Sequence, residues 1–133
     1  MAVLVDSNVL LDIVTRDPVW LRWSLEQLDR HAPVGALLVN NVICAEISVR
    51  LPDVATCHEF LASTGLEWQP MPRGALFLAG RAHSTYRKRG GSRTGVLPDF
   101  FTGAHAAVEG WSVLTRDAAR YRTYFPTLTL IAP

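Results

Sequence analysis

Four acidic residues have positions that suggest chemistry: three stand at or near the end of a predicted strand or the start of a predicted helix, and Glu46 lies about two turns into a helix. Asp6 directly follows a short apolar run, and Asp117 comes two residues after another. Glu46 and Asp99 lie on predicted helices, Asp99 in a first turn beside a proline. In open α/β sheets, functional groups collect beyond the carboxyl ends of the strands. We therefore expect these four carboxylates to meet at one edge of a sheet.

A cluster of four carboxylates predicts a bound cation. Without counter-ions, mutual repulsion raises the pKa of each carboxyl group, and a metal ion removes that penalty. Hard oxygen ligands select Mg²⁺ or Mn²⁺ before zinc. The four histidines and two cysteines show no spacing typical of zinc ligands, which disfavours zinc further.

Each acid also has an interpretation that involves no chemistry. Asp6 can cap the helix that follows it, Asp117 can be a cap or a turn residue, and Asp99 suits the positive end of a helix dipole. Glu46 can pair with Arg50 one turn later. However, the neighbours of Glu46 are apolar nearly all round the helix, so its carboxylate is expected to be partly buried. Either Arg50 or a cation must then compensate its charge.

The elements that must position these acids alternate between strand and helix. Strands are predicted at residues 3–5, 36–39, 67–69, 112–115 and 128–131, as short apolar runs without polar alternation. Such strands are typical of a parallel sheet covered on both faces. We therefore expect an α/β fold, a three-layer α/β/α sandwich with a short central parallel sheet, formed by one domain over residues 1–133.

The helices are predicted from cap residues and apolar periodicity. We expect Ser7-Asn8 to cap the first helix and Asp17 to cap the second, in which Leu21, Leu25 and Leu28 form a core stripe. The other predicted helices run from Asn40-Asn41 to about residue 51, and over residues 53–63, 74–89, 98–108 and 118–125.

Composition excludes several classes of protein. The chain has 133 residues, of which 49% are apolar and 19% charged, so it can bury a core and is neither disordered nor of low complexity. Two cysteines are too few for a disulfide scaffold. No basic leader and no apolar stretch of membrane-spanning length is visible. We expect a protein of the cytoplasm.

Basic residues concentrate in one acid-free stretch, although the net charge is only +1. Six of the thirteen lie between Glu67 and Asp99, namely Arg73, Arg81, Arg87, Lys88, Arg89 and Arg93. Outside the four candidate acids, thirteen bases face eight acids, a balance of +5. This distribution suits a polyanionic partner, although a solvated helix end and loop produce the same pattern.

The order of these motifs resembles the PIN-domain (PilT N-terminus) ribonucleases, in particular the VapC-type toxins of type II toxin–antitoxin pairs. The resemblance spans nearly the whole chain and rests on four segments, at residues 3–12, 43–47, 98–106 and 113–117. They contain the motifs Asp6-Ser7-Asn8, Ala45-Glu46, Pro98-Asp99 and Thr115-Arg116-Asp117, the last followed by Tyr121.

The resemblance implies a PIN-like fold and a metal site made by matching residues. The acids that match are Asp6, Glu46, Asp99 and Asp117, with Asn8 and Thr115 at supporting polar positions. Many relatives carry a further acid where this chain has Thr102. The family also implies homodimers, and inhibition by a cognate antitoxin whose C-terminal segment covers the active site.

The resulting hypothesis is an endonuclease that hydrolyses RNA phosphodiester bonds with Mg²⁺ or Mn²⁺ and leaves a 3′-hydroxyl and a 5′-phosphate. Asp6 and Asp99 are the expected direct metal ligands, and Glu46 and Asp117 complete the set or orient the attacking water. The predicted RNA contacts are Arg81, Arg87, Lys88, Arg89, Arg93 and Arg116.

Two alternatives remain open. A haloacid-dehalogenase-like phosphatase also opens with a strand that ends in an aspartate, but its second carboxylate would stand where this chain has Asn8. Such a phosphatase also needs a lysine, and the only lysine here is Lys88, in the basic stretch. The second alternative is an RNA- or protein-binding module that keeps the fold without the chemistry.

Overall fold

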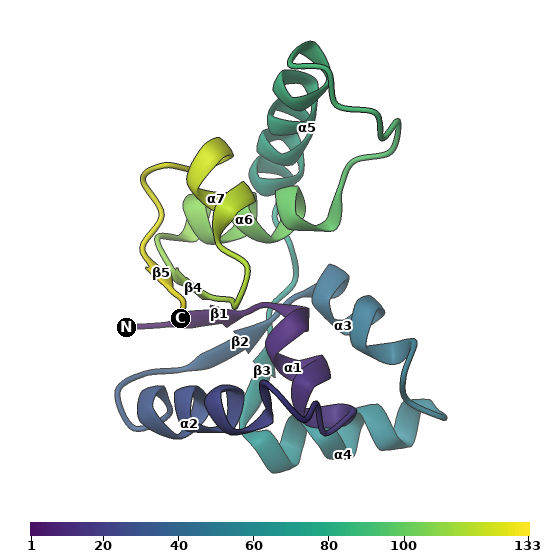
Figure 1. The fold of residues 1–133 in the computed structure, drawn as a ribbon, viewed down its shortest axis with the longest axis vertical. Coiled ribbons are helices and arrows are strands. Elements are labelled where there is room, and N and C mark those ends of the chain that lie inside the picture. The colour runs from purple at the N-terminus through teal and green to yellow at the C-terminus, as the bar shows by residue number, and fades with distance from the viewer.

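A five-stranded parallel sheet forms the centre of the molecule in the computed structural model, which describes residues 1–133 (Figure 1). The strands occur in the order β3-β2-β1-β4-β5. Their bounds are β1 (Val3–Val5), β2 (Leu37–Val39), β3 (Leu66–Trp68), β4 (Ser112–Leu114) and β5 (Leu130–Ile131). Val3 of β1 pairs with Leu37 on one side and with Ser112 on the other, so β2, β1 and β4 end at the same edge.

Seven helices cover the two faces of this sheet. They are α1 (Ser7–Val14), α2 (Leu21–His31), α3 (Asn41–Ser48), α4 (Val54–Thr64), α5 (Arg73–Lys88), α6 (Pro98–Glu109) and α7 (Ala119–Tyr124). Figure 1 shows α1, α2 and α4 on one side of the strands and α5, α6 and α7 on the other. The predicted three-layer α/β/α architecture is therefore confirmed. None of the helices combines the length and the apolar character needed to cross a bilayer.

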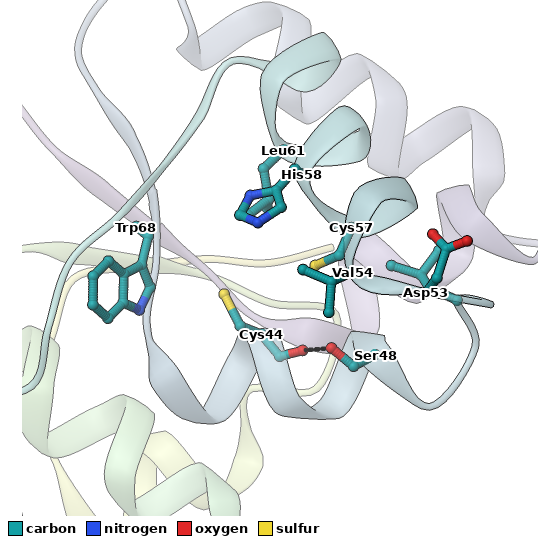
Figure 2. Close-up of a pocket in the computed structure, with 9 residues that line it drawn as sticks. Cys44, Ser48, Asp53, Val54, Cys57, His58, Leu61 and Trp68 are labelled. Atoms are coloured by element: carbon teal, nitrogen blue, oxygen red, sulfur yellow. Dashed lines mark hydrogen bonds between the residues drawn. The ribbon is translucent and has the colours of Figure 1, made fainter.

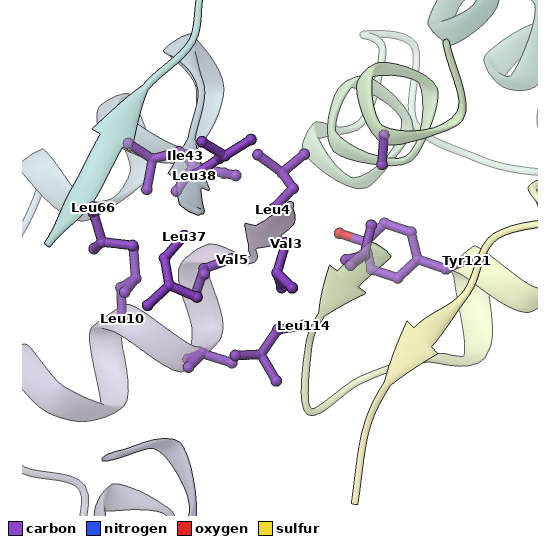
Figure 3. Packing of buried hydrophobic residues seen from close by; sticks show 14 of the residues in the cluster. Val3, Leu4, Val5, Leu10, Leu37, Leu38, Ile43, Leu66, Leu114 and Tyr121 are labelled. Carbon is purple, nitrogen blue, oxygen red and sulfur yellow. The ribbon is translucent and has the colours of Figure 1, made fainter. Parts of the chain in front are cut away.

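The core lies between the sheet and its two helical layers. Every residue of β1, β2 and β4 is buried, which explains why these strands are apolar at successive positions rather than alternating. Side chains of α1 and α3 pack against the strands in the same cluster (Figure 3). Tyr121 of α7 is the largest fully buried side chain.

The start of α1 differs from the prediction. Asp6, not Ser7-Asn8, is the cap residue: its backbone is extended and its Oδ1 atom accepts a hydrogen bond of 2.7 Å from the Ser7 N–H. One carboxylate oxygen of Asp6 thus serves the helix, as the interpretation without chemistry suggested.

The prediction for α2 was wrong in its start and at one position of its core stripe, Leu25, whereas Leu28 is buried in the core as expected. Asp17 accepts hydrogen bonds from the backbone N–H groups of Val19 and Trp20 and forms a turn, so the helix begins only at Leu21. Leu25 is 41% exposed, whereas Ser24 is buried. The Ser24 hydroxyl donates to Asp12 of α1 over 2.8 Å, and this polar contact turns Ser24, rather than Leu25, toward the core.

The remaining elements follow the prediction closely. Asn40 caps α3 by accepting from the Ile43 N–H, and Asp53 caps α4 by accepting from the Thr56 N–H. Gly65 ends α4 with a left-handed φ of 69°, a conformation that glycine adopts without strain. Helix α3 ends at Ser48, about one turn before the predicted residue 51.

Candidate active site

Asp6 lies at the centre of the candidate site, where β1 meets α1. It is only 4% exposed, and its carboxylate accepts hydrogen bonds on both oxygens. Oδ2 accepts from the Tyr121 hydroxyl at 2.8 Å, the Thr115 hydroxyl at 2.9 Å and, more weakly, the Asn8 amide at 3.5 Å. The groups that hold this carboxylate therefore come from three separate parts of the chain.

Thr115 and Asn8 link the end of β4 to the end of β1. The Asn8 amide donates to the Thr115 hydroxyl over 3.1 Å, and its Oδ1 atom accepts from the Arg116 N–H. The Asp117 N–H donates to the same threonine hydroxyl over 3.1 Å. These bonds fix the turn that carries Asp117 beside Asp6, while the Asp117 side chain stays exposed and caps no helix.

Glu46 joins the site from α3. Its Oε1 atom accepts a hydrogen bond of 3.0 Å from the hydroxyl of Ser7, the residue directly after Asp6. The structure contains three ion pairs, and none of them joins Glu46 to Arg50. The half-buried Glu46 carboxylate therefore faces the Asp6 turn without a neutralising arginine.

Asp99 lies in the first turn of α6, directly after the proline that begins the helix. Its side chain is 33% exposed, and its Oδ2 atom lies 3.4 Å from an Nη atom of Arg120 on α7. Arg120 was not among the predicted site residues. It is the one cationic group that pairs with any of the four acids.

Each of the four acids lies close enough to another for the charge of one to raise the pKa of the other. Burial raises the pKa of Asp99 to about 6, repulsion from Asp6 and Asp117 adds to the shift, and Arg120 opposes it. Burial also raises the pKa of Glu46, and both Asp6 and Asp99 add to that rise. For Asp6, burial raises the pKa while the bonds from Tyr121 and Thr115 lower it. The structure thus brings all four predicted carboxylates together.

Comparison with solved structures identifies the same fold in bacterial complexes. One chain of the VapBC2 complex of Rickettsia felis, bound to a promoter DNA fragment, superposes with a TM-score of 0.75 at 16% identity, over 100% of this chain and 99% of that one. A chain of the DNA-bound VapBC of Salmonella typhimurium superposes with a TM-score of 0.70 at 14% identity, over 99% of this chain and 98% of that one. A chain of VapBC-1 of Haemophilus influenzae superposes with a TM-score of 0.73 at 12% identity, also over 99% of this chain and 98% of that one. This chain has the PIN-domain fold. No protein-family model and no curated protein matches its sequence.

The donor set at the edge of this PIN fold is chemically suited to a hard divalent cation. Carboxylates that raise one another's pKa are stabilised by a cation between them, and oxygen donors favour Mg²⁺ or Mn²⁺. No three acidic, histidine or cysteine side chains are arranged as a ready-formed metal site. Asp99 is paired with Arg120 through its Oδ2 atom, so this guanidinium competes with a cation for the carboxylate.

The predicted RNA-contacting arginines differ in how far their side chains are already engaged. Arg116 donates to the buried carboxylate of Asp12 over 2.9 Å and lies above the Trp20 ring, so its guanidinium is held on α1 rather than left free beside the acids. Arg87 donates to backbone oxygens of the loop after α5, at Gly91 and Arg93. The side chains of Arg81, Lys88, Arg89 and Arg93 are exposed.

Three residues that complete the site were not predicted to belong to it: Ser7, Arg120 and Tyr121. Ser7 is adjacent to Asp6 and was predicted only as part of a helix cap. Tyr121 follows Asp117 by four residues, one helical turn, and an aromatic residue at that spacing was the available signal. No local signal identified Arg120, because its partner Asp99 lies 21 residues away.

Histidine and cysteine take no part in the acidic site. His105 is buried, contacts Asn40 over 3.2 Å and packs on Trp111. Cys44, Cys57 and His58 line an apolar groove of about 530 Å³ between α3, α4 and β3, where Trp68 is 53% exposed (Figure 2). Burial raises the pKa of the Cys44 thiol to about 11, which keeps it protonated. None of the four acids lines this groove.

Proposed function

We propose that this protein is a metal-dependent endoribonuclease that hydrolyses RNA phosphodiester bonds with Mg²⁺ or Mn²⁺. The observation that carries the proposal is the meeting of Asp6, Glu46, Asp99 and Asp117 at the carboxyl edge of a PIN-fold sheet. The basic stretch on α5 and its loop supports a polyanionic substrate.

The carboxylates have separate tasks in this proposal. Asp6 and Asp99 hold the metal ion, and Glu46 and Asp117 complete its ligand set or orient the attacking water. A bound divalent cation supplies Lewis-acid stabilisation of the phosphate and a more acidic water. Tyr121 and Thr115 favour the ionised form of Asp6, because both donate to its Oδ2 atom.

We further propose that the protein is the toxin of a toxin–antitoxin pair. Solved structures with this fold include VapBC and FitAB complexes, which supports a cognate antitoxin as its partner. As part of the same proposal, the protein forms a homodimer and acts in the cytoplasm. An antitoxin that covers the acidic site would inhibit cleavage.

The deciding experiment is cleavage of total RNA by the purified protein. We expect fragments with 5′-phosphate ends in Mg²⁺ or Mn²⁺, and no cleavage in EDTA or with Asp6→Ala. Asp29→Ala removes an exposed acid from α2 and is the matched control. Since Asp6 also caps α1, circular dichroism must show that the variant is folded, and Asp6→Asn is a second variant with the same shape. Equal cleavage by folded Asp6→Ala would exclude the proposal.

The phosphatase alternative makes a different prediction. Asn8 stands where a second carboxylate is needed, and its amide is bonded to Asp6 and Thr115. Hydrolysis of p-nitrophenyl phosphate with a covalent phospho-Asp6 would support the phosphatase. RNA binding and a cellular effect that are both unchanged in Asp6→Asn would support a module without catalysis.

A further inference from the structure

A second cavity adjoins the acidic site and has walls that metal binding does not use. This cavity of about 360 Å³, the α5–α7 pocket, is lined by Tyr86, Asp99, Asp117, Ala119, Arg120, Thr123 and Tyr124. It lies on the side of the sheet where Figure 1 shows α5, α6 and α7 together. Its volume falls at the lower end of the range for small-ligand sites, about 300–1,000 Å³.

Two tyrosine rings form the wall opposite the carboxylates. Tyr86 and Tyr124 are half-buried, and their ring centroids lie 6.4 Å apart. Both rings pack edge-on against the buried ring of Phe100, at 5.6 and 5.0 Å, which holds them in place. Aromatic side chains fixed in this way and open to solvent are suited to stacking on nucleic-acid bases.

One guanidinium group, that of Arg120, lines the same pocket, and a second, that of Arg89, lies over the ring of Tyr124. Arg120 reaches Asp99 at 3.4 Å, and its Cζ atom is 5.9 Å from the Tyr86 centroid. Arg89 lies 5.4 Å from the Tyr124 centroid. The Arg120–Asp99 contact is long and both side chains are partly exposed, so this ion pair is weak and exchangeable. A phosphate beside Asp99 would offer Arg120 a stronger partner.

We propose that the α5–α7 pocket binds one unpaired nucleotide of the RNA substrate next to the cleaved bond, with the base on Tyr124 and a phosphate on Arg120. This inference rests on the proposed function and requires the nucleotide in the pocket to be unpaired, because a paired base cannot reach the tyrosine ring. Arg120 then has two partners in turn, Asp99 before metal binding and the phosphate afterwards.

The first test measures RNA binding without cleavage. Fluorescein-labelled oligouridylate and oligoadenylate of about twelve nucleotides are titrated in EDTA, each alone and annealed to the other, and followed by fluorescence anisotropy. We expect both Tyr124→Ala and Arg120→Ala to weaken single-strand binding about tenfold, and the duplex to bind about tenfold more weakly than either strand. Tyr124→Phe keeps the ring and should bind as the wild type does.

Arg122→Ala is the matched control, because Arg122 carries the same charge on the same helix but does not line the pocket. Three outcomes would each refute the proposed role of the pocket. They are an equal loss of RNA affinity in Arg122→Ala and Arg120→Ala, unchanged RNA binding by Tyr124→Ala, and no binding of any strand. Binding as expected in a protein that never cleaves RNA would leave the pocket in place and refute the nuclease. If the protein cleaves RNA and none of these variants loses RNA binding, the nuclease proposal would stand and the proposed role of the pocket would be refuted.

The second test uses Mn²⁺ alone, measured by titration calorimetry. Removing Arg120 frees Asp99, so Arg120→Ala should bind Mn²⁺ several-fold more tightly than the wild type even though it binds RNA more weakly. Arg122→Ala should leave the Mn²⁺ affinity unchanged. An unchanged or weaker Mn²⁺ affinity in Arg120→Ala would overturn the exchange of Arg120 between Asp99 and phosphate.

Discussion

The Tyr121 hydroxyl donates a hydrogen bond of 2.8 Å to the Oδ2 atom of Asp6, a residue that lies 115 positions earlier in the chain. Tyr121 is only 1% exposed, so this bond is shielded from water. It connects α7 to the end of β1, and it favours the ionised form of a carboxylate whose pKa burial raises. Both the stability of the fold and the charge of the candidate site therefore depend on it.

Tyr121→Phe should lower the free energy of unfolding by about 1–3 kcal/mol, because a buried carboxylate loses one of its donors. Urea denaturation followed by circular dichroism measures this change. Tyr124→Phe is the control, since the Tyr124 hydroxyl makes no hydrogen bond within the protein, and it should change stability by less than about 0.5 kcal/mol. Equal losses in the two variants would show that the Tyr121–Asp6 bond contributes nothing specific.

Mn²⁺ or Mg²⁺ should stabilise the folded protein. At about a hundredfold excess over the dissociation constant, a ligand of the folded state alone adds about 2.7 kcal/mol to the free energy of unfolding. Differential scanning calorimetry with and without each ion measures the shift in melting temperature. Asp99→Asn should lose most of the shift and Asp29→Asn should keep it. If neither ion shifts the wild-type melting temperature, the metal site is excluded.

The stability of the metal-free protein should depend on pH through Asp99. The pKa of the Asp99 carboxyl group rises on folding from the ordinary 3.8 to about 6. Between these two pH values, the folded protein therefore holds a proton that the unfolded chain has released. The free energy of unfolding therefore falls as pH rises through this range. Asp99→Asn lacks this contribution and should show a shallower fall in urea denaturation. Because the side chain is one-third exposed, solvent reduces the size of the difference but not its sign.

Two helical glycines should respond to alanine in opposite directions. A Cβ atom on Gly103 of α6 would lie 2.5 Å from the buried ring of Phe125, and such overpacking costs about 1–3 kcal/mol. Gly80 of α5 is exposed and has no neighbouring atom within 4 Å of such a Cβ, so Gly80→Ala should stabilise by about 0.5–1 kcal/mol. Thermal unfolding compares the two, and a stabilising Gly103→Ala would contradict the packing seen at Phe125.

Much of the fold follows from local features of the sequence. The apolar runs of β1, β2 and β4 and the cap of α3 at Asn40 are short-range patterns, and the structure confirms them. Local patterns failed at one position of α2, where Ser24, bonded to Asp12, is buried instead of Leu25. Apolar periodicity does not report such long-range polar contacts.

The candidate site, like the fold, was predicted from the sequence only in part. Asp6, Asp99 and Asp117 were predicted because each stands at or near an element boundary, and a parallel sheet gathers such boundaries at one edge. Glu46 was predicted because it is a charged residue on a helix that is otherwise apolar nearly all round. The sequence by itself did not determine how these acids are held. The hydrogen bonds that hold them join residues 21 to 115 positions apart, namely Tyr121 to Asp6, Ser7 to Glu46 and Arg120 to Asp99. Beside the site, Arg116 is joined to Asp12 in the same way. Only the tertiary structure decides such pairs, because they depend on strand register and helix packing, which bring distant parts of the chain within hydrogen-bonding distance.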